Sequence, residues 1–401
     1  MENDFTRRLV VPAETRIAMI IMDGLGGLPR EPGGKTELET ACTPNLDALA
    51  SRSALGLTVP AGPGITVGSG PGHLAIFGYD PIQYEIGRGA LEALGVDFEL
   101  GVDDVAARGN FCTLDKAGII VNRRAGRLPT DAACELLDVL QTIKIDGLEL
   151  FLRPVKEHRF AFVMRGPGLA DALTDTDPQK TGVRPLTVQA LQPSAEAAAR
   201  AANRFLEEAR CLLAGRQPAN MVMLRGFASL PRIPTFAERY GLHAAAIALH
   251  GMYRGVARLA GMEVLPIRGQ TVEAEFATLE ECWHDFDFFY LHVKKTDTCG
   301  ESGNFDGKVK AIEEVDALIP RLLSLDPDVI FVGGDHSSPA VLQSHSWHPV
   351  PALLFGKHIR PDGIPEFGEH ACLRGSLGVV PATHIMPLAL ANAGRITKYG
   401  A

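Results

Sequence analysis

A chain of 401 residues is longer than one hydrophobic core usually supports, which favours two domains or one large domain with an insertion. Hydrophobic residues make up 46% and charged residues 22%, which is the composition of a compact globular protein and not of a disordered chain. The net charge of −9 argues against a nucleic-acid partner, because duplex binding depends on basic side chains that displace counterions. A small anionic substrate is still possible, since its binding depends on local charge in a cleft.

The cysteine pattern and the N-terminal sequence indicate in which cellular compartment the protein is expected. The seven cysteines are scattered, odd in number and without a C-x-x-C pair, which disfavours a disulfide framework and a zinc ribbon. Near the N-terminus the apolar run is interrupted by Pro12, Glu14 and Arg16, so we expect neither a signal peptide nor a membrane span. The sequence therefore predicts a cytoplasmic protein.

The first predicted element is a strand at residues 16–22 (RIAMIIM), an apolar run typical of a buried parallel strand. It ends at Asp23-Gly24, where α/β folds build their sites, although such a pair is also a common turn. A helix is expected at residues 43–52, with Thr43 as N-cap and Pro44 at its first position. The glycine-rich stretch 62–72 then surrounds Ser69, and is either a phosphate-binding loop or only a flexible connection.

The middle of the chain, residues 102–216, reads as an inserted α+β domain. Its predicted elements are strands at 109–114, 118–122, 149–154 and 159–165 and an alanine-rich helix at 194–213. The predicted core is therefore discontinuous, consisting of residues 1–101 and 217–401, and the insert is a candidate substrate-binding lid.

The last part of the chain repeats the pattern of an apolar strand followed by acidic residues or histidine. Residues 286–293 lead to Asp297, and residues 329–332 lead to Asp335-His336, with His345 close behind. A helix is expected at residues 308–319, with Pro320 just beyond its end. Strands that alternate with helices predict a mainly parallel sheet covered by helices on both faces.

These residues share a chemistry. Carboxylates and imidazoles together suit manganese, zinc or magnesium, and two ions need about as many ligands as Asp23, Asp297, Asp335, His336 and His345 provide. The Ser69 hydroxyl is a weak nucleophile at neutral pH, but a metal ion stabilises its alkoxide. The residues alone thus point to metal-assisted transfer of a phosphoryl group.

The motifs that surround these residues resemble those of the archaeal-type, cofactor-independent phosphoglycerate mutases, which belong to the alkaline phosphatase superfamily. The resemblance covers nearly the whole chain and rests on DGLGGLP at Asp23, TPNLDALA at Thr43, GPGITVGSGPGHLAIFGYDP at Gly62, GRGALEALG at Gly87, RGNFCTLD at Arg108, EHR at Glu157, TDTDP at Thr174, HVKKTD at His292, GKVKAIEEVD at Gly307, GGDHSSPA at Gly333 and HSWHPVP at His345. It implies an alkaline-phosphatase-like α/β core with an inserted α+β domain, two divalent ions and a small phosphorylated acid as substrate.

Carried over position by position, the resemblance implies that Asp23, Ser69, Asp335 and His336 surround one ion, while Asp297 and His345 hold the other. The family's remaining ligand is the His of T-D-x-x-G-H-D-G, where this chain has Glu301. Glutamate is a competent oxygen ligand and favours manganese or magnesium over zinc or cobalt, unless the substitution weakens the site. A second departure is Arg254, where these mutases tend to carry a catalytic Lys; Arg keeps the charge but cannot give up a proton.

Substrate recognition is assigned to His73, four positions after Ser69 as in the related bacterial and plant enzymes, and to cationic or imidazole side chains of the insert. Arginine matches both carboxylate and phosphate, although any one of these side chains could instead be solvated or paired. The candidates are Arg108, Arg123, Arg124, Arg127, His158 and Arg159.

The activity expected from the resemblance is interconversion of 3-phosphoglycerate and 2-phosphoglycerate, a step of glycolysis and gluconeogenesis, through phosphorylated Ser69. Two alternatives stay open. One is a metal-dependent phosphatase or phosphodiesterase on the same core, and the other is a non-catalytic homologue that kept the fold. A homo-oligomer is possible.

Overall fold

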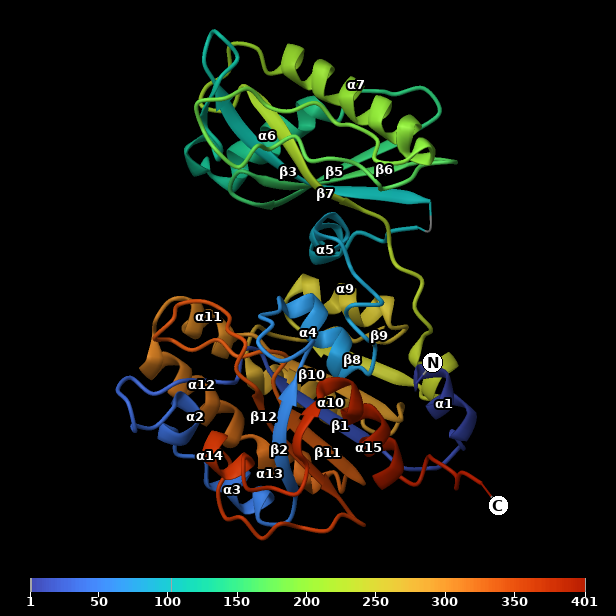
Figure 1. Ribbon diagram of the computed structural model, residues 1–401, viewed down its shortest axis with the longest axis vertical. Coiled ribbons are helices and arrows are strands. Elements are labelled where there is room, and N and C mark those ends of the chain that lie inside the picture. The colour runs from blue at the N-terminus through green and yellow to red at the C-terminus, as the bar shows by residue number, and fades with distance from the viewer. Residues whose placement is uncertain (1, 102, 401) are drawn as a thin grey trace. The chain divides into compact units, whose positions relative to one another are not determined.

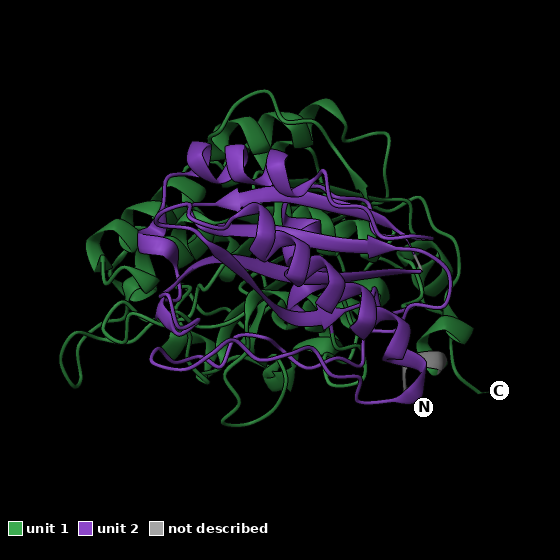
Figure 2. Cartoon of the chain, turned by 90° about the horizontal axis from the view of Figure 1, so that it is seen from above, with its two compact units in different colours: residues 1–85, 233–401 green, residues 86–232 purple. Residues whose placement is uncertain are grey.

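The computed structural model describes residues 2–101 and 103–400, and the chain forms two compact units (Figure 1; Figure 2). Unit 1 consists of residues 1–85 and 233–401, and unit 2 of residues 86–232. Both expected domain boundaries, at 101/102 and 216/217, fall inside unit 2, and Val102 itself lies outside the described residues.

The described part of unit 1 contains an eight-stranded, mainly parallel sheet, ordered β13-β2-β12-β11-β1-β10-β8-β9, in which only β12 runs antiparallel to its neighbours. Its strands are β1 (Ile17–Met22), β2 (Ala54–Val59), β8 (Ala244–Ala248), β9 (Glu263–Val264), β10 (Phe288–Val293), β11 (Val329–Gly333), β12 (Val350–Gly356) and β13 (Gly378–Pro381). Its helices are α1 (Glu2–Leu9), α2 (Glu37–Thr40), α3 (Pro44–Ala50), α4 (Ser69–Ile76), α8 (Phe236–Tyr240), α9 (Gly251–Leu259), α10 (Val272–Glu281), α11 (Lys295–Glu301), α12 (Phe305–Asp316), α13 (Ile319–Ser324), α14 (Glu369–Cys372) and α15 (Ile385–Asn392).

Both faces of this sheet are covered, as predicted. Every residue of β1 is buried, although successive side chains point to opposite faces. Ala18, Ile20 and Met22 pack in one core with apolar residues of α3, α10, α12 and α13. On the other side of the fold, α9 packs against α4 and β8, and α15 against β11 and β12. The mixed α/β fold with a mainly parallel sheet is thus confirmed.

Unit 2 is built on a five-stranded antiparallel sheet within its described residues, ordered β4-β3-β6-β5, in which β7 also pairs with β3. Its elements are α5 (Arg88–Gly95), β3 (Asp104–Leu114), β4 (Ile120–Asn122), α6 (Thr130–Leu140), β5 (Glu149–Lys156), β6 (Arg159–Arg165), α7 (Glu196–Leu212) and β7 (Met221–Ala228). Helices α6 and α7 bury their apolar faces against one side of the sheet, and Ala93 of α5 packs on the other.

Two sequence predictions need correction. The domain boundaries were set too far inward, because α5 covers the sheet of unit 2 and β7 forms one of its strands. The helix expected at 308–319 is α12, which ends at Asp316; Pro320 lies in the first turn of α13. Proline fits there because the first backbone N–H groups of a helix have no intrahelical partner.

Candidate metal centre and anion pocket

The polar residues that follow β1, β10 and β11 meet at one edge of the sheet. Strand β1 pairs in parallel with β10 on one side and with β11 on the other, so the three carboxyl ends lie together. Asp23 follows β1, Asp297 lies on α11 just after β10, and Asp335-His336 follows β11. The sequence prediction that these side chains converge is therefore matched by the backbone topology.

Asp23, Asp335 and His336 form one group of possible metal ligands, with all ligand atoms within 4.8 Å of one another. The Nε2 atom of His336 lies 3.2 Å from Oδ1 of Asp23 and 3.3 Å from Oδ2 of Asp335. Both carboxylate oxygens are buried, and apart from these histidine contacts and that of His73 with Oδ2 of Asp335 they have no hydrogen-bond partner among the described residues. Because buried carboxylates normally find a partner, the two open oxygens next to an imidazole nitrogen fit a divalent ion.

Asp297, His336 and His345 form a second group under the same distance limit. The rings of His336 and His345 stack with centroids 3.7 Å apart, and Nε2 of His345 lies 3.4 Å from Oδ1 of Asp297. The Oε1 atom of Glu301 lies 3.5 Å from Nε2 of His345 but falls outside the group, and its side chain is 54% exposed. The structure thus brings Glu301 to the edge of the second group without burying it.

Hydrogen bonds fix which imidazole nitrogen faces each group. Nδ1 of His345 lies 2.9 Å from the carbonyl oxygen of Val67, and donating to it leaves Nε2 as the open nitrogen. Ser338 donates its hydroxyl to Oδ1 of Asp297 at 2.5 Å, so its oxygen can accept from Nδ1 of His336 at 3.2 Å. To bind a metal ion, both histidines would have to present an unprotonated Nε2, with the proton on Nδ1.

Lys294 was not singled out from the sequence, although it belongs to the motif HVKKTD. Its ammonium donates to Oδ2 of Asp23 at 3.1 Å, to Oδ2 of Asp297 at 2.6 Å and to the hydroxyl of Tyr253 at 2.7 Å. Burial alone would raise the pKa of Asp23, but hydrogen bonds with His292 and His336 and the Lys294 charge hold it well below its usual range. Lys294 thus connects the carboxylates of the two groups and partly neutralises them.

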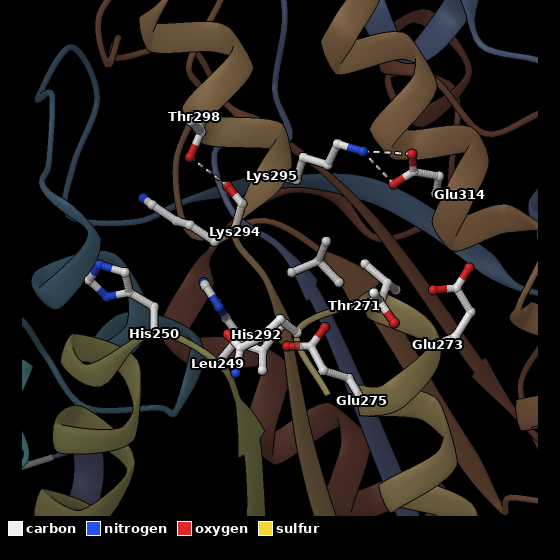
Figure 3. A pocket seen from close by; sticks show the side chains of 13 residues that line it. Leu249, His250, Thr271, Glu273, Glu275, His292, Lys294, Lys295, Thr298 and Glu314 are labelled. Carbon is white, nitrogen blue, oxygen red and sulfur yellow. Dashed lines mark hydrogen bonds and ion pairs between the residues drawn. The ribbon is translucent and has the colours of Figure 1, made fainter. Parts of the chain in front are cut away.

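A cavity of about 490 Å³ lies beside Lys294 on unit 1 (Figure 3). Figure 3 shows His292 and Glu275 among its lining side chains, together with Lys294 and Lys295. Both lysines already have carboxylate partners, Lys294 with Asp297 and Lys295 with Glu314. Burial raises the pKa of Glu275 to about 8. His292 supports Asp23 from this side, with Nε2 3.0 Å from Oδ2 of that carboxylate.

Ser69 is the first residue of α4, a helix that the glycine-rich sequence concealed. Its hydroxyl oxygen lies 3.1 Å from Nε2 of His336, and the side chain is nearly buried. Gly72, one turn later, lies so close to the backbone of Asp335 that a Cβ atom there would overlap it. The amino end of a helix carries partial positive charge and open N–H groups, which favour a phosphate on Ser69.

The structure gives no support to the assignment of His73 to substrate binding. His73 is fully buried, with Nδ1 2.8 Å from the carbonyl oxygen of Ser69 and 3.1 Å from Oδ2 of Asp335. Rings of Tyr253 and His292 surround it. A side chain without exposed surface cannot contact a substrate, so His73 instead supports Asp335 from behind.

Arg254 lies on α9, which packs beside α4. Its Nη1 donates to the carbonyl oxygen of Leu249 at 2.8 Å, and the side chain is partly buried. It belongs to neither group of possible ligands, so a catalytic role for Arg254 stays a prediction.

Unit 2 gathers the predicted cationic side chains around one cavity of about 450 Å³. Arg108, Arg123, Arg124, Arg127, His158 and Arg159 all line it. The sequence interpretation missed Arg88 of α5, Lys156 of β5 and Arg225 of β7, and also Asn110, which shares β3 with Arg108; all four line the same cavity. The acidic residues of the lining, Glu157 and Asp177, are too few to neutralise so many cations, so the cavity suits an anionic ligand.

Two side chains of this pocket have distinct environments. Asp177 accepts a bidentate pair from Arg123, at 3.0 and 2.7 Å, and this guanidinium helps to lower the pKa of the carboxyl against the effect of burial. Burial and the charge of Arg159 lower the pKa of His158 to about 4. His158 is therefore neutral near pH 7 and acts as a hydrogen-bonding group among cations.

Among the described residues, no helix is both long and apolar enough to cross a membrane.

Comparisons with known proteins agree with the family resemblance of the sequence. Residues 50–220 match the family model of 2,3-bisphosphoglycerate-independent phosphoglycerate mutase. A Thermus thermophilus protein named a probable 2,3-bisphosphoglycerate-independent phosphoglycerate mutase is 50% identical, covering 98% of each chain, and a Thermotoga neapolitana protein of the same name is also 50% identical, covering 99% of this chain and 98% of its own.

Solved structures agree with the sequence relatives. The cofactor-independent phosphoglycerate mutase of Thermoplasma acidophilum superposes with a TM-score of 0.76 at 30% identity, covering 95% of this chain and 100% of its own. A Pyrococcus horikoshii protein superposes with a TM-score of 0.81 at 31% identity, covering 96% and 99%. With half of its residues identical to those of its relatives over nearly the full length, the chain is an enzyme of the 2,3-bisphosphoglycerate-independent phosphoglycerate mutase family.

Proposed function

We propose that the enzyme interconverts 3-phosphoglycerate and 2-phosphoglycerate by carrying the phosphoryl group on Ser69 between two metal ions. The observation that supports this most directly is the place of the Ser69 hydroxyl, at the amino end of α4 and 3.1 Å from Nε2 of His336. His336 belongs to both groups of possible ligands. A nucleophile at the junction of two ion sites suits in-line phosphoryl transfer, because a pair of ions can stabilise both the attacking and the leaving oxygen.

The residues present fit two divalent ions. Asp23, Ser69, Asp335 and His336 would hold one, and Asp297, His345 and Glu301 the other. When bound, the ions would stabilise the Ser69 alkoxide and neutralise the transferring phosphoryl group. The many carboxylates favour manganese, with magnesium, zinc or cobalt as alternatives.

The cavity of unit 2 would bind the anionic groups of phosphoglycerate. Arg108, Arg124 and Arg159 present guanidinium forks that suit carboxylate and phosphate oxygens. Neutral His158 can hydrogen-bond a substrate oxygen without adding charge.

In the reaction, the Ser69 oxygen forms a bond to phosphorus as the bond from phosphorus to the substrate oxygen breaks. The freed glycerate then presents its other hydroxyl, which takes the phosphoryl group back and restores Ser69. Water must be excluded meanwhile, because hydrolysis of phosphorylated Ser69 would make the enzyme a phosphatase. The roles of unit 2 as a lid and of Arg254 as a cation beside phosphorylated Ser69 belong to this proposal.

Two assays run in parallel test the proposal. Metal-stripped protein is supplied with manganese, magnesium, zinc and cobalt in turn, and 2-phosphoglycerate formation and inorganic phosphate release are measured from 3-phosphoglycerate. We expect metal-dependent mutase turnover well above phosphate release, with manganese most effective. Phosphate release without isomerisation would instead identify a phosphatase, and activity that survives complete metal removal would exclude the two-metal mechanism.

Replacing Arg159 tests the anion pocket of unit 2. Arg159 begins β6 directly after the turn at Glu157-His158, and it lines the cavity. Lysine keeps the charge but cannot make a bidentate contact, so Arg159→Lys should change KM or kcat by about tenfold or more. Arg200→Lys, on the exposed side of α7, is the matched control and should leave steady-state kinetics unchanged. Wild-type kinetics for Arg159→Lys would assign the residue a structural role.

A further inference from the structure

Lys308 is a fully buried lysine of α12 that the proposed reaction does not use. Its ammonium donates to the carbonyl oxygen of Gly26 at 3.0 Å and to that of Ser338 at 2.9 Å. Gly26 lies three residues after Asp23, and Ser338 lies two residues after His336. A buried cation thus joins the two segments that carry the proposed ligands.

Glu37, the first residue of α2, makes the opposite contacts with the same two segments. It is also fully buried, and its carboxylate accepts from the backbone N–H of Leu28 at 3.1 Å and from that of Ala340 at 2.7 Å. Lys308 therefore holds backbone carbonyl groups of segments 23–28 and 335–340, while Glu37 holds their N–H groups. We call these two segments the ligand loops.

The ligand loops are also bonded directly to each other. The N–H of Ser338 lies 3.0 Å from the carbonyl oxygen of Gly26, and the N–H of Gly24 donates to Oδ1 of Asp335 at 3.0 Å. Gly27 has no room for a Cβ atom, because that atom would overlap the carboxylate of Glu37. The ligand loops, Lys308 and Glu37 are thus closely packed against one another.

Ser338 connects the ligand loops to Asp297, a proposed ligand of the second ion. While its carbonyl oxygen accepts from Lys308, its hydroxyl donates to Asp297 and lies within hydrogen-bond distance of Nδ1 of His336. A shift of the Ser338 backbone would therefore move one ligand of each proposed ion. Outer partners of metal ligands commonly control affinity in this way.

We infer that Lys308 and Glu37 are positioning residues of the metal centre, which fix the two ligand loops from both sides so that Asp23, Asp335, His336 and Asp297 are held at ion-binding separation. The inference rests on the two-metal site proposed above. Burying a lysine costs free energy, and an apolar side chain of similar length would fill the space more cheaply if packing were its only role. The charged side chain is needed for the two carbonyl groups that it orients.

The test compares manganese affinity with stability in metal-stripped protein. Lys308→Met keeps the length of the side chain and removes the donors, and Lys310→Met, at an exposed position of the same helix, is the matched control. We expect Lys308→Met to weaken manganese binding by about 10- to 100-fold in calorimetric titrations, and the control to match the wild type. A folded Lys308→Met protein with wild-type affinity for both ions would show that Lys308 serves packing only.

Glu37→Gln keeps the inference testable if Lys308→Met does not fold. Glu37→Gln replaces one of the two accepting oxygens by an amide donor that faces a backbone N–H group, so it should also weaken manganese binding, and unchanged affinity there would overturn the inference. Ser338→Ala removes the link to Asp297. Where Lys308→Met folds, it is combined with Ser338→Ala. If Lys308 acts through Ser338, the losses of manganese affinity in this double variant should be clearly less than additive, whereas full additivity would contradict that route. A wild-type chain that binds no manganese would instead overturn the proposed metal site itself.

Discussion

Ser69→Ala is expected to lower mutase activity by more than about 1,000-fold, which corresponds to about 4 kcal/mol in the barrier. Alanine cannot accept the phosphoryl group, and no other hydroxyl has been assigned to that role. The fold should survive, because alanine fits the first position of α4 and the contacts of the Ser69 hydroxyl with His336 and Tyr253 lie within the site. Much of the manganese binding should remain, because Asp23, Asp335 and His336 are unchanged.

The measurement is the coupled mutase assay, with a manganese titration of the same preparation. Ser324→Ala, at an exposed helix end of the same unit, is the control for loss of a serine hydroxyl and should retain full activity. Mass spectrometry of wild-type enzyme mixed with substrate should detect one added phosphoryl group, and the Ser69→Ala protein should carry none. A loss of tenfold or less would remove Ser69 from the role of nucleophile.

Glu301→Ala is expected to lose one ion and most of the activity. Glu301 stands where the family motif has histidine, and its carboxylate lies 3.5 Å from Nε2 of His345. Without Glu301, only Asp297 and His345 remain for the second ion besides the shared His336. Loss of a residue that only contacts a metal ligand costs roughly 10- to 100-fold, so loss of a direct ligand should lower activity by at least that much. Because the Glu301 side chain is exposed, its truncation should leave the fold intact, so the loss of activity should reflect the loss of the ion. Metal content per chain and mutase rate are the measurements.

Glu301→His is the informative counterpart. In place of Glu301, imidazole removes one negative charge from the proposed second ion site and adds a nitrogen ligand, so the variant should stay active while its metal preference shifts from manganese toward zinc or cobalt. Glu314→His, on α12 and paired with Lys295, changes a glutamate outside the ligand groups and serves as the control. Full activity and two ions per chain in Glu301→Ala would mean that another residue or water completes the second site.

The strands that carry the site could be predicted because of how they are buried. A parallel strand covered on both faces is a nearly continuous apolar run, as the sequences of β1 and β11 show, and β10 departs from this mainly at His292. The residues after such strands meet at one edge of the sheet, which made Asp23, Asp297, Asp335 and His336 predictable as a set. Short-range patterns also located β5, β6 and α7 to within a few residues.

Other features depended on which distant segments pack together. His73 looked like a substrate ligand from its spacing to Ser69, yet the direction of its ring is set by Tyr253 and Asp335, far away in the sequence. Likewise, α5 and β7 join unit 2 through contacts with β3 that no local pattern reveals.

The sequence by itself determined the strand ends, the ligand types and the family to which they belong, since these follow from local apolar runs and short motifs. The tertiary structure alone decided which charges act together. Lys294 lies between Asp23 and Asp297, Arg88 and Arg225 join the arginines of unit 2, and Lys308 connects the ligand loops. From the sequence alone, a lysine or arginine is expected to lie on the surface in contact with water. Only the folded structure shows whether it is buried and which groups it contacts, and these two facts distinguish a solvated charge from one that orients a site.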